Sequence, residues 1–378
     1  AQTYFNINGA AYTGAAGLTA MASLPQNTPT AAYGTLGDLS GITPGFRATA
    51  VYVGTSLESP LADHLTGVVS ARSGDTLTVH GASLLTRVGA TKFVNNATVT
   101  LGSGTVVSED GVAVSGLTPL SVSVGQQLEA SGQGAVDTSG NVTLDASAGQ
   151  VRLAATRIWG TLNSATAGSA SLNVLSIGNF APAGFNFAGT GAGGQTANPS
   201  AYALNTGSLD QSATAPGTLL QVDGIVNAFG VAPPDFTATA ISAGSATEQR
   251  LVVEWINGGA TAPFTSASTA GLVVDLNNAN LGTIHSIRTG PAALDLKSLA
   301  ASPLITTVGA AQSNLRLAIG SITPSTGMSV FNSVTGFATA LSSTFNGTNK
   351  IYRLVAVGRY DSTTNTFVAS RISVALQE

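Results

Sequence analysis

The stretch GRYDSTTNTFVASRI (358–372) has the pattern of a strand, a polar turn and a second strand, and GAVDTSGNVTLDA (134–146) has the same pattern more than two hundred residues earlier. In both stretches a Gly precedes an Asp by three positions, and an Asn follows that Asp by four. Strands bounded by Gly, Asp and Asn are typical of β-hairpins. We therefore expect equivalent final hairpins in two copies of a repeated unit.

The polar turn residues explain how each hairpin reverses direction. The pairs are Asp137 with Asn141 and Asp361 with Asn365. Asp and Asn side chains bond their own backbone and tolerate left-handed geometry, which a tight turn requires. Calcium would need several further oxygen ligands that these pairs lack. The turn interpretation is therefore preferred to a metal site.

Other strand patterns recur in the same order along the chain. An opening strand, soon followed by a second strand, is predicted at ADHLTGVV (62–69), TRIWGTL (156–162) and EQRLVVEW (248–255). A later strand is entered through a Gly-containing turn at SVGQQLEASG (123–132), APGTLLQVDG (215–224), NGTNKIYRLVAVG (346–358) and TPGFRATAVYVG (43–54). Such recurrence is the mark of tandem structural units.

These recurrences divide the chain into four units. We expect an incomplete first β-barrel at 1–60, a second at 61–155, a third at 156–245, and a fourth at 246–378 with short helical insertions. Helix patterns are scarce, and the two best are PAALDLKSLAAS (291–302) and SVFNSVTGFATALSS (329–343). The fold class predicted is all-β, with tandem small antiparallel barrels and one or two short helices.

The composition excludes several classes of protein. Only 8% of residues are charged, whereas 43% are hydrophobic, so uncharged polar side chains and backbone must wet the surface. No apolar run approaches the ~18 residues of a membrane-spanning helix. Alternating clusters of Val, Leu, Ile and Phe argue against disorder. Aromatic residues make up only 6%, too few for the girdles of a lipid-facing barrel.

The net charge of -4, with single scattered basic residues, argues against nucleic acid as a partner. Zero Cys excludes disulfides, thiolate metal sites and cysteine nucleophiles. Abundant Ser, Thr, Gly and Ala, with three Lys, is typical of secreted and cell-surface bacterial proteins. We expect such a location, with a signal peptide already removed.

Short motifs carry a family resemblance along the whole chain. They are GVV (67–69) or GTL (160–162) on the first strand, GDTLTV (74–79) or FNING (5–9) on the second, Pro-Gly before the fourth, and Gly-x-x-Asp before the fifth. With these motifs the units resemble a domain-of-unknown-function family that occurs in tandem in bacterial cell-envelope lipoproteins. The resemblance implies small five-stranded barrels of the OB type, and that family carries no catalytic pattern. This chain departs from the family in having no lipidated Cys.

The first unit departs from the other units at its start. Its segment AQTYFNINGAAYTG (1–14) aligns with the second strand of the others, so its opening strand is absent from the sequence. One interpretation is that upstream residues were removed. The other is that a neighbouring molecule supplies a strand by strand addition, which would repeat head to tail into filaments or rings. The inter-subunit strands would then contain Tyr4, Phe5, Ile7, Ile372, Val374 and Leu376.

Motifs for catalysis or cofactor binding do not fit their required contexts. The three His residues are far apart, without a second His at metal-ligand spacing. The string GTGAGG (189–194) does not lead into a helix, as a dinucleotide motif must. Adjacent Glu109 and Asp110 point apart on a strand or turn, so they cannot flank one glycosidic bond. We expect no catalytic residues, no metal and no cofactor.

Aromatic side chains are the best candidates for ligand binding. OB-type barrels bind nucleic acid or sugars with stacking aromatics. Trp159, Trp255, Tyr352 and Tyr360 lie on or beside predicted strands. The alternative for the two Trp residues, which occupy corresponding opening strands, is packing between adjacent barrels.

The sequence favours a non-enzymatic structural or interaction protein of the bacterial surface or extracellular space. Its partner would be further copies of itself or another envelope component. The alternative function is binding of a carbohydrate or envelope ligand on the aromatic faces of the barrels. An enzyme ranks third.

Overall fold

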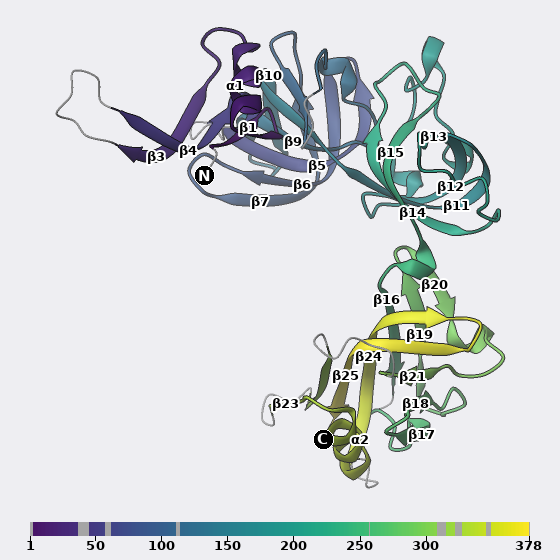
Figure 1. Cartoon of the computed structure of the whole chain (residues 1–378). Helices are drawn as coiled ribbons and strands as arrows, with labels where there is room; N and C mark the ends of the chain where they lie inside the picture. The colour runs from purple at the N-terminus through teal and green to yellow at the C-terminus, as the bar shows by residue number, and fades with distance from the viewer. Residues whose placement is uncertain are drawn as a thin grey trace. The chain divides into compact units, whose positions relative to one another are not determined.

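The computed structural model describes residues 3–36, 45–56, 62–110, 114–256, 258–307, 315–321, 327–344 and 349–377 (Figure 1). Strands dominate these residues, so the predicted all-β class is confirmed. The chain divides into two compact units, Ala1–Ile241 and Ser242–Glu378. The two units are described separately below.

The first sheet of unit 1 lies within residues 4–53. Its elements are β1 (Tyr4–Ile7), β2 (Ala10–Thr13), the helix α1 (Ala15–Ala22), β3 (Thr30–Leu36) and β4 (Phe46–Val53). The strand order is β2-β1-β4-β3, with β1 parallel to β4 and the other pairs antiparallel. Helix α1 contacts β1 and β2.

The second sheet contains β5 (Asp63–Ser73), β6 (Thr76–Leu85), β7 (Thr91–Thr100), β8 (Val106–Glu109), β9 (Gln127–Val136) and β10 (Val142–Ala154). Its order is β7-β6-β5-β9-β10-β8, and a parallel pairing of β7 with β10 joins five of these strands into a ring.

The third sheet is a closed barrel. Its strands are β11 (Thr156–Thr166), β12 (Ser169–Ile177), β13 (Tyr202–Asn205), β14 (Leu219–Val226) and β15 (Phe236–Ala243). They are ordered β11-β12-β13-β15-β14, and β13 runs parallel to β15. Parallel pairing of the third and fifth strands is therefore common to the ring in the second sheet and to this barrel.

Unit 2 contains one sheet of ten strands and a helix. The strands are β16 (Gln249–Trp255), β17 (Phe264–Ser268), β18 (Gly271–Val274), β19 (Leu281–Thr289), β20 (Ala292–Asp295), β21 (Leu304–Thr306), β22 (Arg316–Ser321), β23 (Met328–Phe331), β24 (Lys350–Asp361) and β25 (Thr366–Gln377), with α2 at Val334–Thr344. The strand β24 pairs with both β16 and β25, and β25 runs parallel to β21 and β22. Apolar side chains of the sheet and α2 form one core.

The two stretches quoted at the outset form hairpins, as predicted. The first connects β9 to β10 and the second connects β24 to β25. Asp137 Oδ1 accepts hydrogen bonds from the backbone N–H groups of Ser139 (2.9 Å) and Asn141 (2.8 Å). Asp361 Oδ1 accepts one from the N–H of Thr363 at 2.8 Å. The predicted turn role of these Asp residues is therefore confirmed.

One of the two predicted helices is wrong. The segment 291–302 contains strand β20, which pairs with β19, followed by a 3₁₀ turn at Leu296–Ser298. Gly290 has a φ of 56° and turns the chain back onto β19, so tertiary pairing overrides the local helix pattern. The segment 329–343 does contain helix α2, which begins at Val334 after β23.

Helix α1 was not predicted from the sequence. Its Gly17 lowers the helix propensity, yet the residue is needed there. A Cβ at Gly17 would overlap the ring of Phe5 on β1, so only Gly lets the helix approach the sheet. Gly17 therefore weakens the helical pattern in the sequence and also allows the helix to pack against the sheet.

The strands of the first sheet also occupy later places in the repeat than their sequence patterns predict. The segment 43–54 was aligned with fourth strands, but β4 is the last strand of its sheet and follows its antiparallel partner β3. The segment 1–14 was aligned with second strands, but β1 pairs in parallel with β4. This is the relation of β22 to β25 in unit 2. The first sheet therefore repeats the second half of the last sheet.

A glycine on the penultimate strand of each of the four sheets faces a backbone carbonyl on the last strand. A Cβ there would overlap the carbonyl oxygen. The pairs are Gly34 with Arg47, Gly132 with Asp145, Gly224 with Thr237, and Gly358 with Val368. Close backbone approach is a recognised use of Gly within a strand. In the β3–β4 and β24–β25 pairs the ladder shifts register beside Gly34 and Gly358, which marks a bulge.

The described sheets lie within the four predicted ranges, since their strands span 4–53, 63–154, 156–243 and 249–377. The division between the two compact units, after Ile241, falls close to the predicted boundary at 245. The other two boundaries stay predictions.

The strand glycines make a direct prediction. Gly224→Ala forces a Cβ against the Thr237 carbonyl and should lower the free energy of unfolding by about 1–3 kcal/mol, as overpacking does. Gly184→Ala is the matched control, because its Cβ would meet nothing within 4 Å. Urea unfolding followed by tryptophan fluorescence measures both. Equal stability of the two variants would contradict a steric role for Gly224.

Candidate functional site

An apolar groove lies on the first sheet, between α1 and β3. Its volume is about 350 Å³, and it is lined by Thr3, Phe5, Gly14, Leu18, Met21, Thr30, Ala32, Ala48 and Val51. Leu18 on α1 is 62% exposed, whereas Phe5 and Val51 form its buried floor. A large apolar side chain exposed beside a buried apolar floor is typical of a binding groove.

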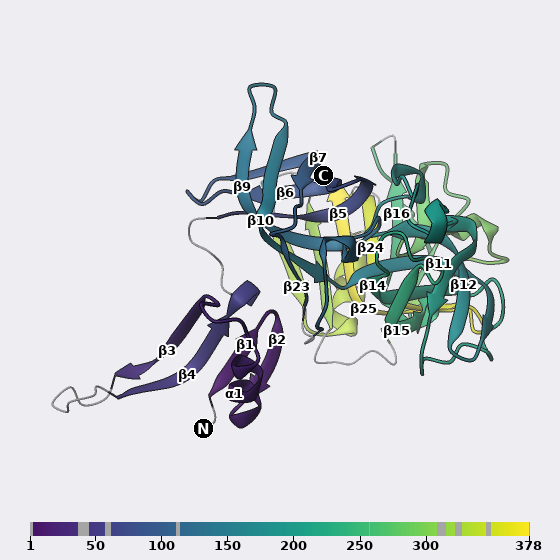
Figure 2. The same ribbon diagram turned by 90° about the horizontal axis from the view of Figure 1, so that it is seen from above.

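The strand β3 lines one side of this groove through Thr30 and Ala32. It is also the outer edge of the sheet (Figure 2). The N–H of Gly54 donates to the carbonyl of Pro29 at 2.8 Å, so these two residues form a hydrogen-bonded pair of the β3–β4 ladder. Hydrogen-bonded pairs alternate with non-hydrogen-bonded pairs along an antiparallel ladder. Thr30 and Ala32 fall on the alternate positions, and their backbone groups therefore point away from β4. Among the described residues, no strand pairs with this edge of β3.

The opposite face of the first sheet carries three tyrosines. Tyr52 packs edge-on against Tyr4 at 6.3 Å and against Tyr33 at 5.6 Å between ring centroids. Tyr33 is 61% exposed and Tyr4 is 37% exposed. We call these three residues the tyrosine face. Nothing in the sequence pattern marks Tyr33 or Tyr52 as members of one face, since strand register decides which aromatic side chains share it.

The two tryptophans predicted to stack on a ligand are buried. Trp159 is 5% exposed and Trp255 is fully buried. Trp255 packs edge-on against Phe264, with ring centroids 6.4 Å apart, within the core of unit 2. A ligand cannot reach these rings, so the stacking role is wrong for both. Each ring is buried on the first strand of its sheet, β11 for Trp159 and β16 for Trp255.

The two predicted tyrosines lie apart on β24. Tyr352 is 42% exposed and sits where the β24–β25 ladder shifts register. Tyr360 packs against the core, and its hydroxyl donates to Asn365 Oδ1 at 2.9 Å. Eight residues of strand separate them by about 26 Å, so they do not form one platform.

The predicted inter-subunit strands are occupied within this chain. Phe5 and Ile7 are buried in the core of the first sheet, while Tyr4 belongs to the tyrosine face. The strand β25 is paired on both sides, and Ile372, Val374 and Leu376 are buried in the core of unit 2. The folded chain therefore does not offer β25 as a free donor strand, and donation would require its own sheet to open.

A Ser–His–Glu group lies on the second sheet. The ring nitrogen His64 Nδ1 is 2.9 Å from Ser131 Oγ and 3.9 Å from Glu129 Oε1. A catalytic triad places the serine and the acid on opposite ring nitrogens. Here both contact Nδ1, so the acid cannot orient the ring for proton transfer from the serine. Asp75 Oδ1 lies 3.7 Å from Arg72 Nη2.

The other histidines have local partners. His285 Nε2 lies 3.2 Å from Asp295 Oδ1, and its Nδ1 contacts the carbonyl of Gly282 at 2.9 Å. His80 Nδ1 lies 2.9 Å from Asn96 Oδ1. Over the described residues, no group of three His, Asp or Glu could hold a metal ion. The string GTGAGG contains a 3₁₀ turn at Ala192–Gly194 where a dinucleotide motif requires a helix.

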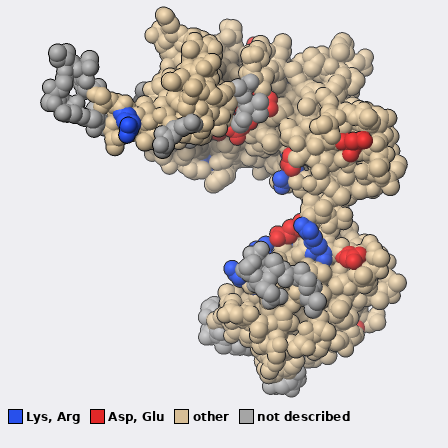
Figure 3. Space-filling model, viewed as in Figure 1, with Lys and Arg blue, Asp and Glu red and all other residues tan. Residues whose placement is uncertain are grey.

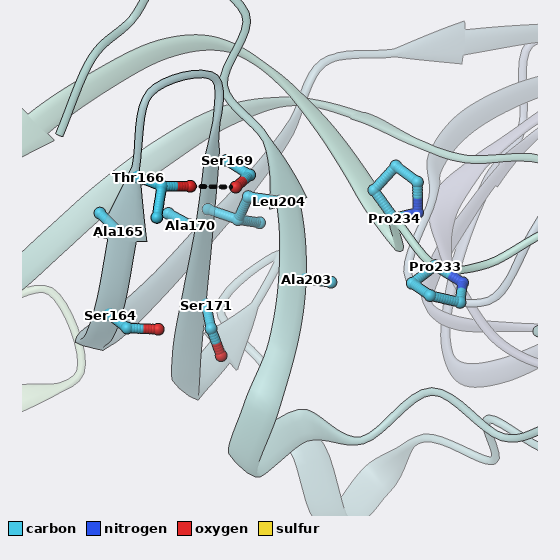
Figure 4. Close-up of a pocket in the computed structure, with 10 residues that line it drawn as sticks. All are labelled: Ser164, Ala165, Thr166, Ser169, Ala170, Ser171, Ala203, Leu204, Pro233 and Pro234. Atoms are coloured by element: carbon cyan, nitrogen blue, oxygen red, sulfur yellow. Dashed lines mark hydrogen bonds between the residues drawn. The ribbon is translucent and has the colours of Figure 1, made fainter. Parts of the chain in front are cut away.

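A second hollow, of about 430 Å³, lies at one end of the third sheet (Figure 4). None of its ten lining residues is titratable, and the hydroxyls of Thr166 and Ser169 bond each other at 2.7 Å. The neighbouring Asp235 is buried, and its Oδ2 accepts a hydrogen bond from the N–H of Ala203 at 2.8 Å. That bond ties β13 to the start of β15, which is a structural role.

Charged side chains are few on the face shown in Figure 3, and most of its surface carries none. The polar surface is mostly hydroxyl and amide, as the composition requires.

No family model, no curated protein and no solved structure matches the chain. Across the part of the chain that the structure describes, no helix has the length and apolar character to cross a membrane.

Asp235 gives a pH-dependent prediction. Burial raises the pKa of the Asp235 carboxyl, and the Ala203 N–H lowers it by less. The folded chain then binds this proton more readily than the unfolded chain, so the stability contribution is largest at low pH and is lost as pH rises through the raised pKa. The free energy of unfolding of Asp235→Asn should therefore increase relative to that of the native chain as the pH rises from about 4 to about 7.

Asp235→Ala is the companion variant, because it removes the acceptor as well as the charge. It should cost about 1–3 kcal/mol near pH 4, since the Ala203 N–H loses its partner, and less near pH 7, because the native chain itself loses the Asp235 contribution as pH rises. Urea unfolding at the two pH values measures both variants. If the difference in unfolding free energy between Asp235→Asn and the native chain did not change with pH, the raised pKa of Asp235 would be contradicted.

Proposed function

We propose that the chain is a non-enzymatic structural and interaction protein of the bacterial surface or extracellular space. Its construction supports this role: small β units follow one another, each with a tightly packed apolar core and an uncharged polar exterior. The observation that carries the proposal is the groove of the first sheet, beside an open edge of β3. An unpaired strand edge is a template for an added strand.

Self-assembly is the proposed form of this interaction. The acceptor is the β3 edge of one copy, and the donor is a strand of a neighbouring copy. A heterologous contact of this kind continues from copy to copy, into filaments or rings. If β25 is the donor, its burial makes assembly slow, because the strand must first leave its own core.

The proposal predicts concentration-dependent assembly of the purified chain into species larger than the 37.5 kDa monomer. Ala32→Asp should reduce assembly at least tenfold, because it places a charge in the groove at the open edge. Sedimentation velocity and negative-stain microscopy measure this. Val88→Ser, at a residue that is 84% exposed elsewhere in unit 1, is the control. A chain that stays monomeric at all concentrations would overturn self-assembly.

A second candidate function, carbohydrate binding, is favoured by the tyrosine face. Tyr4, Tyr33 and Tyr52 present apolar rings and hydroxyl groups together on one sheet face, which suits the mixed surface of a sugar. The charged Arg47 on the same strand as Tyr52 is the nearest basic residue in sequence to this face. A neutral polysaccharide is the ligand class proposed, because the three side chains of this face offer uncharged rings and hydroxyl groups.

Affinity electrophoresis in gels that contain xylan, mannan or a soluble β-glucan tests this candidate. We expect retardation by at least one of them, and about five- to tenfold weaker binding for Tyr33→Ala, from the loss of one aromatic contact. Tyr352→Ala is the matched control on β24, with a ring that is 42% exposed. Loss of binding in Tyr352→Ala but not in Tyr33→Ala would move the site to β24.

A further inference from the structure

The first sheet and the second half of the last sheet have the same construction. A hairpin (β1–β2 or β22–β23), a helix (α1 or α2) and an antiparallel strand pair (β3–β4 or β24–β25) follow in the same order, and the first strand of the hairpin runs parallel to the last strand of the pair. The bulges also correspond. Thr49 Oγ1 donates to the Tyr33 carbonyl at 3.1 Å, and Ser370 Oγ donates to the Val357 carbonyl at 3.3 Å.

Because the construction is the same, each residue of the first sheet can be matched to an equivalent residue of the last sheet. From the registers, Ala32 lies opposite Val51 as Ala356 lies opposite Ile372, and Thr30 lies opposite Val53 as Leu354 lies opposite Val374. In the helices, Leu18 and Phe337 are each the fourth residue. The floor residues Phe5 and Val51 are buried like their equivalents Leu317 and Ile372.

The equivalent residues differ sharply in exposure on the groove side. Phe337 is 2% exposed, but Leu18 is 62% exposed. Ala356 and Leu354 are fully buried, but Ala32 and Thr30 are exposed. The same backbone arrangement is thus covered in the last sheet and open in the first.

The cover in the last sheet includes a single antiparallel strand, β16. Its Leu251 lies opposite Ala356 and its Val253 opposite Leu354. Leu251, Val253 and Trp255 are fully buried on one side of the strand, and the intervening Val252 (3% exposed) and Glu254 (half-buried) alternate onto its other side. An apolar residue at every second position therefore fills the groove that the first sheet leaves open.

We propose that the groove of the first sheet binds an added antiparallel β-strand on the outer edge of β3, in the position that β16 takes on β24. The occupant is an extended partner segment with apolar side chains at alternate positions, like Gln249–Trp255. Its backbone bonds the outward N–H and C=O groups of Thr30 and Ala32, and its apolar side chains cover Leu18, Ala32 and the floor. The inference rests on the proposed interaction role and names the chemistry of its partner.

The probe is a synthetic peptide of residues 248–256, EQRLVVEWI, with a fluorescent label at its amino end. Anisotropy titration with the full chain should show saturable binding. Leu18→Ser and Ala32→Asp should each weaken binding at least tenfold, and both residues are exposed, so neither change removes a core contact. Val88→Ser should leave binding unchanged. A peptide of the same composition without alternation should not bind.

A cross-link fixes the site and the register. Photo-leucine in place of the peptide's residue 251 should attach to β3 or α1, near Ala32, because Leu251 faces the equivalent Ala356 in the last sheet. Digestion and tandem mass spectrometry locate the attachment. Attachment within unit 2 would show that the peptide displaces β16 there, and it would overturn the proposal.

Other outcomes separate this inference from the proposed function. Absence of peptide binding to the native chain, or equal binding to Leu18→Ser, Ala32→Asp and the native chain, overturns the groove as a strand site. Assembly that persists in those variants would overturn the β3 edge as the acceptor, and it would show that copies associate through another surface, which keeps the structural role. Peptide binding by a chain that remains monomeric would support the groove and overturn self-assembly.

Discussion

The contact between a strand glycine and the carbonyl of the neighbouring strand is the constraint on which each sheet depends. Gly34, Gly132, Gly224 and Gly358 let the penultimate strand come close to the last one, where any Cβ would overlap a backbone oxygen. Bulges increase local twist and bend a strand. In each sheet the last strand then runs parallel to an earlier strand of the same sheet.

That shared bend explains why sheets with little sequence in common have common connections. In the second sheet β7 pairs in parallel with β10, in the third β13 pairs with β15, and in unit 2 β22 pairs with β25. The first sheet keeps the parallel pairing of β1 with β4. Its described residues contain no counterpart of β16, which leaves the apolar side chain of Leu18 facing an open groove. The proposed function follows from that difference in cover rather than from any reactive side chain.

Several sequence-based expectations were met because they depend on residues close together in the chain. The turn roles of Asp137 and Asp361 need only a backbone N–H two residues away. Expectations that depend on distant residues failed more often. Trp159 and Trp255 were candidates for ligand stacking, yet strand register turns both inward. The segment 291–302 has a helical pattern, yet β19 recruits it as a strand.

By itself the sequence determined the all-β class, the recurrence of strand patterns and the hairpins that end the second and last sheets. It could do so because alternation and turn chemistry are local properties of the chain. Only the tertiary structure decided that the first sheet matches the later half of the last one, that Leu18 is exposed where Phe337 is buried, and that three tyrosines share a face. Those facts depend on strand register and on which strand covers which, and these are set by contacts between residues far apart in the sequence.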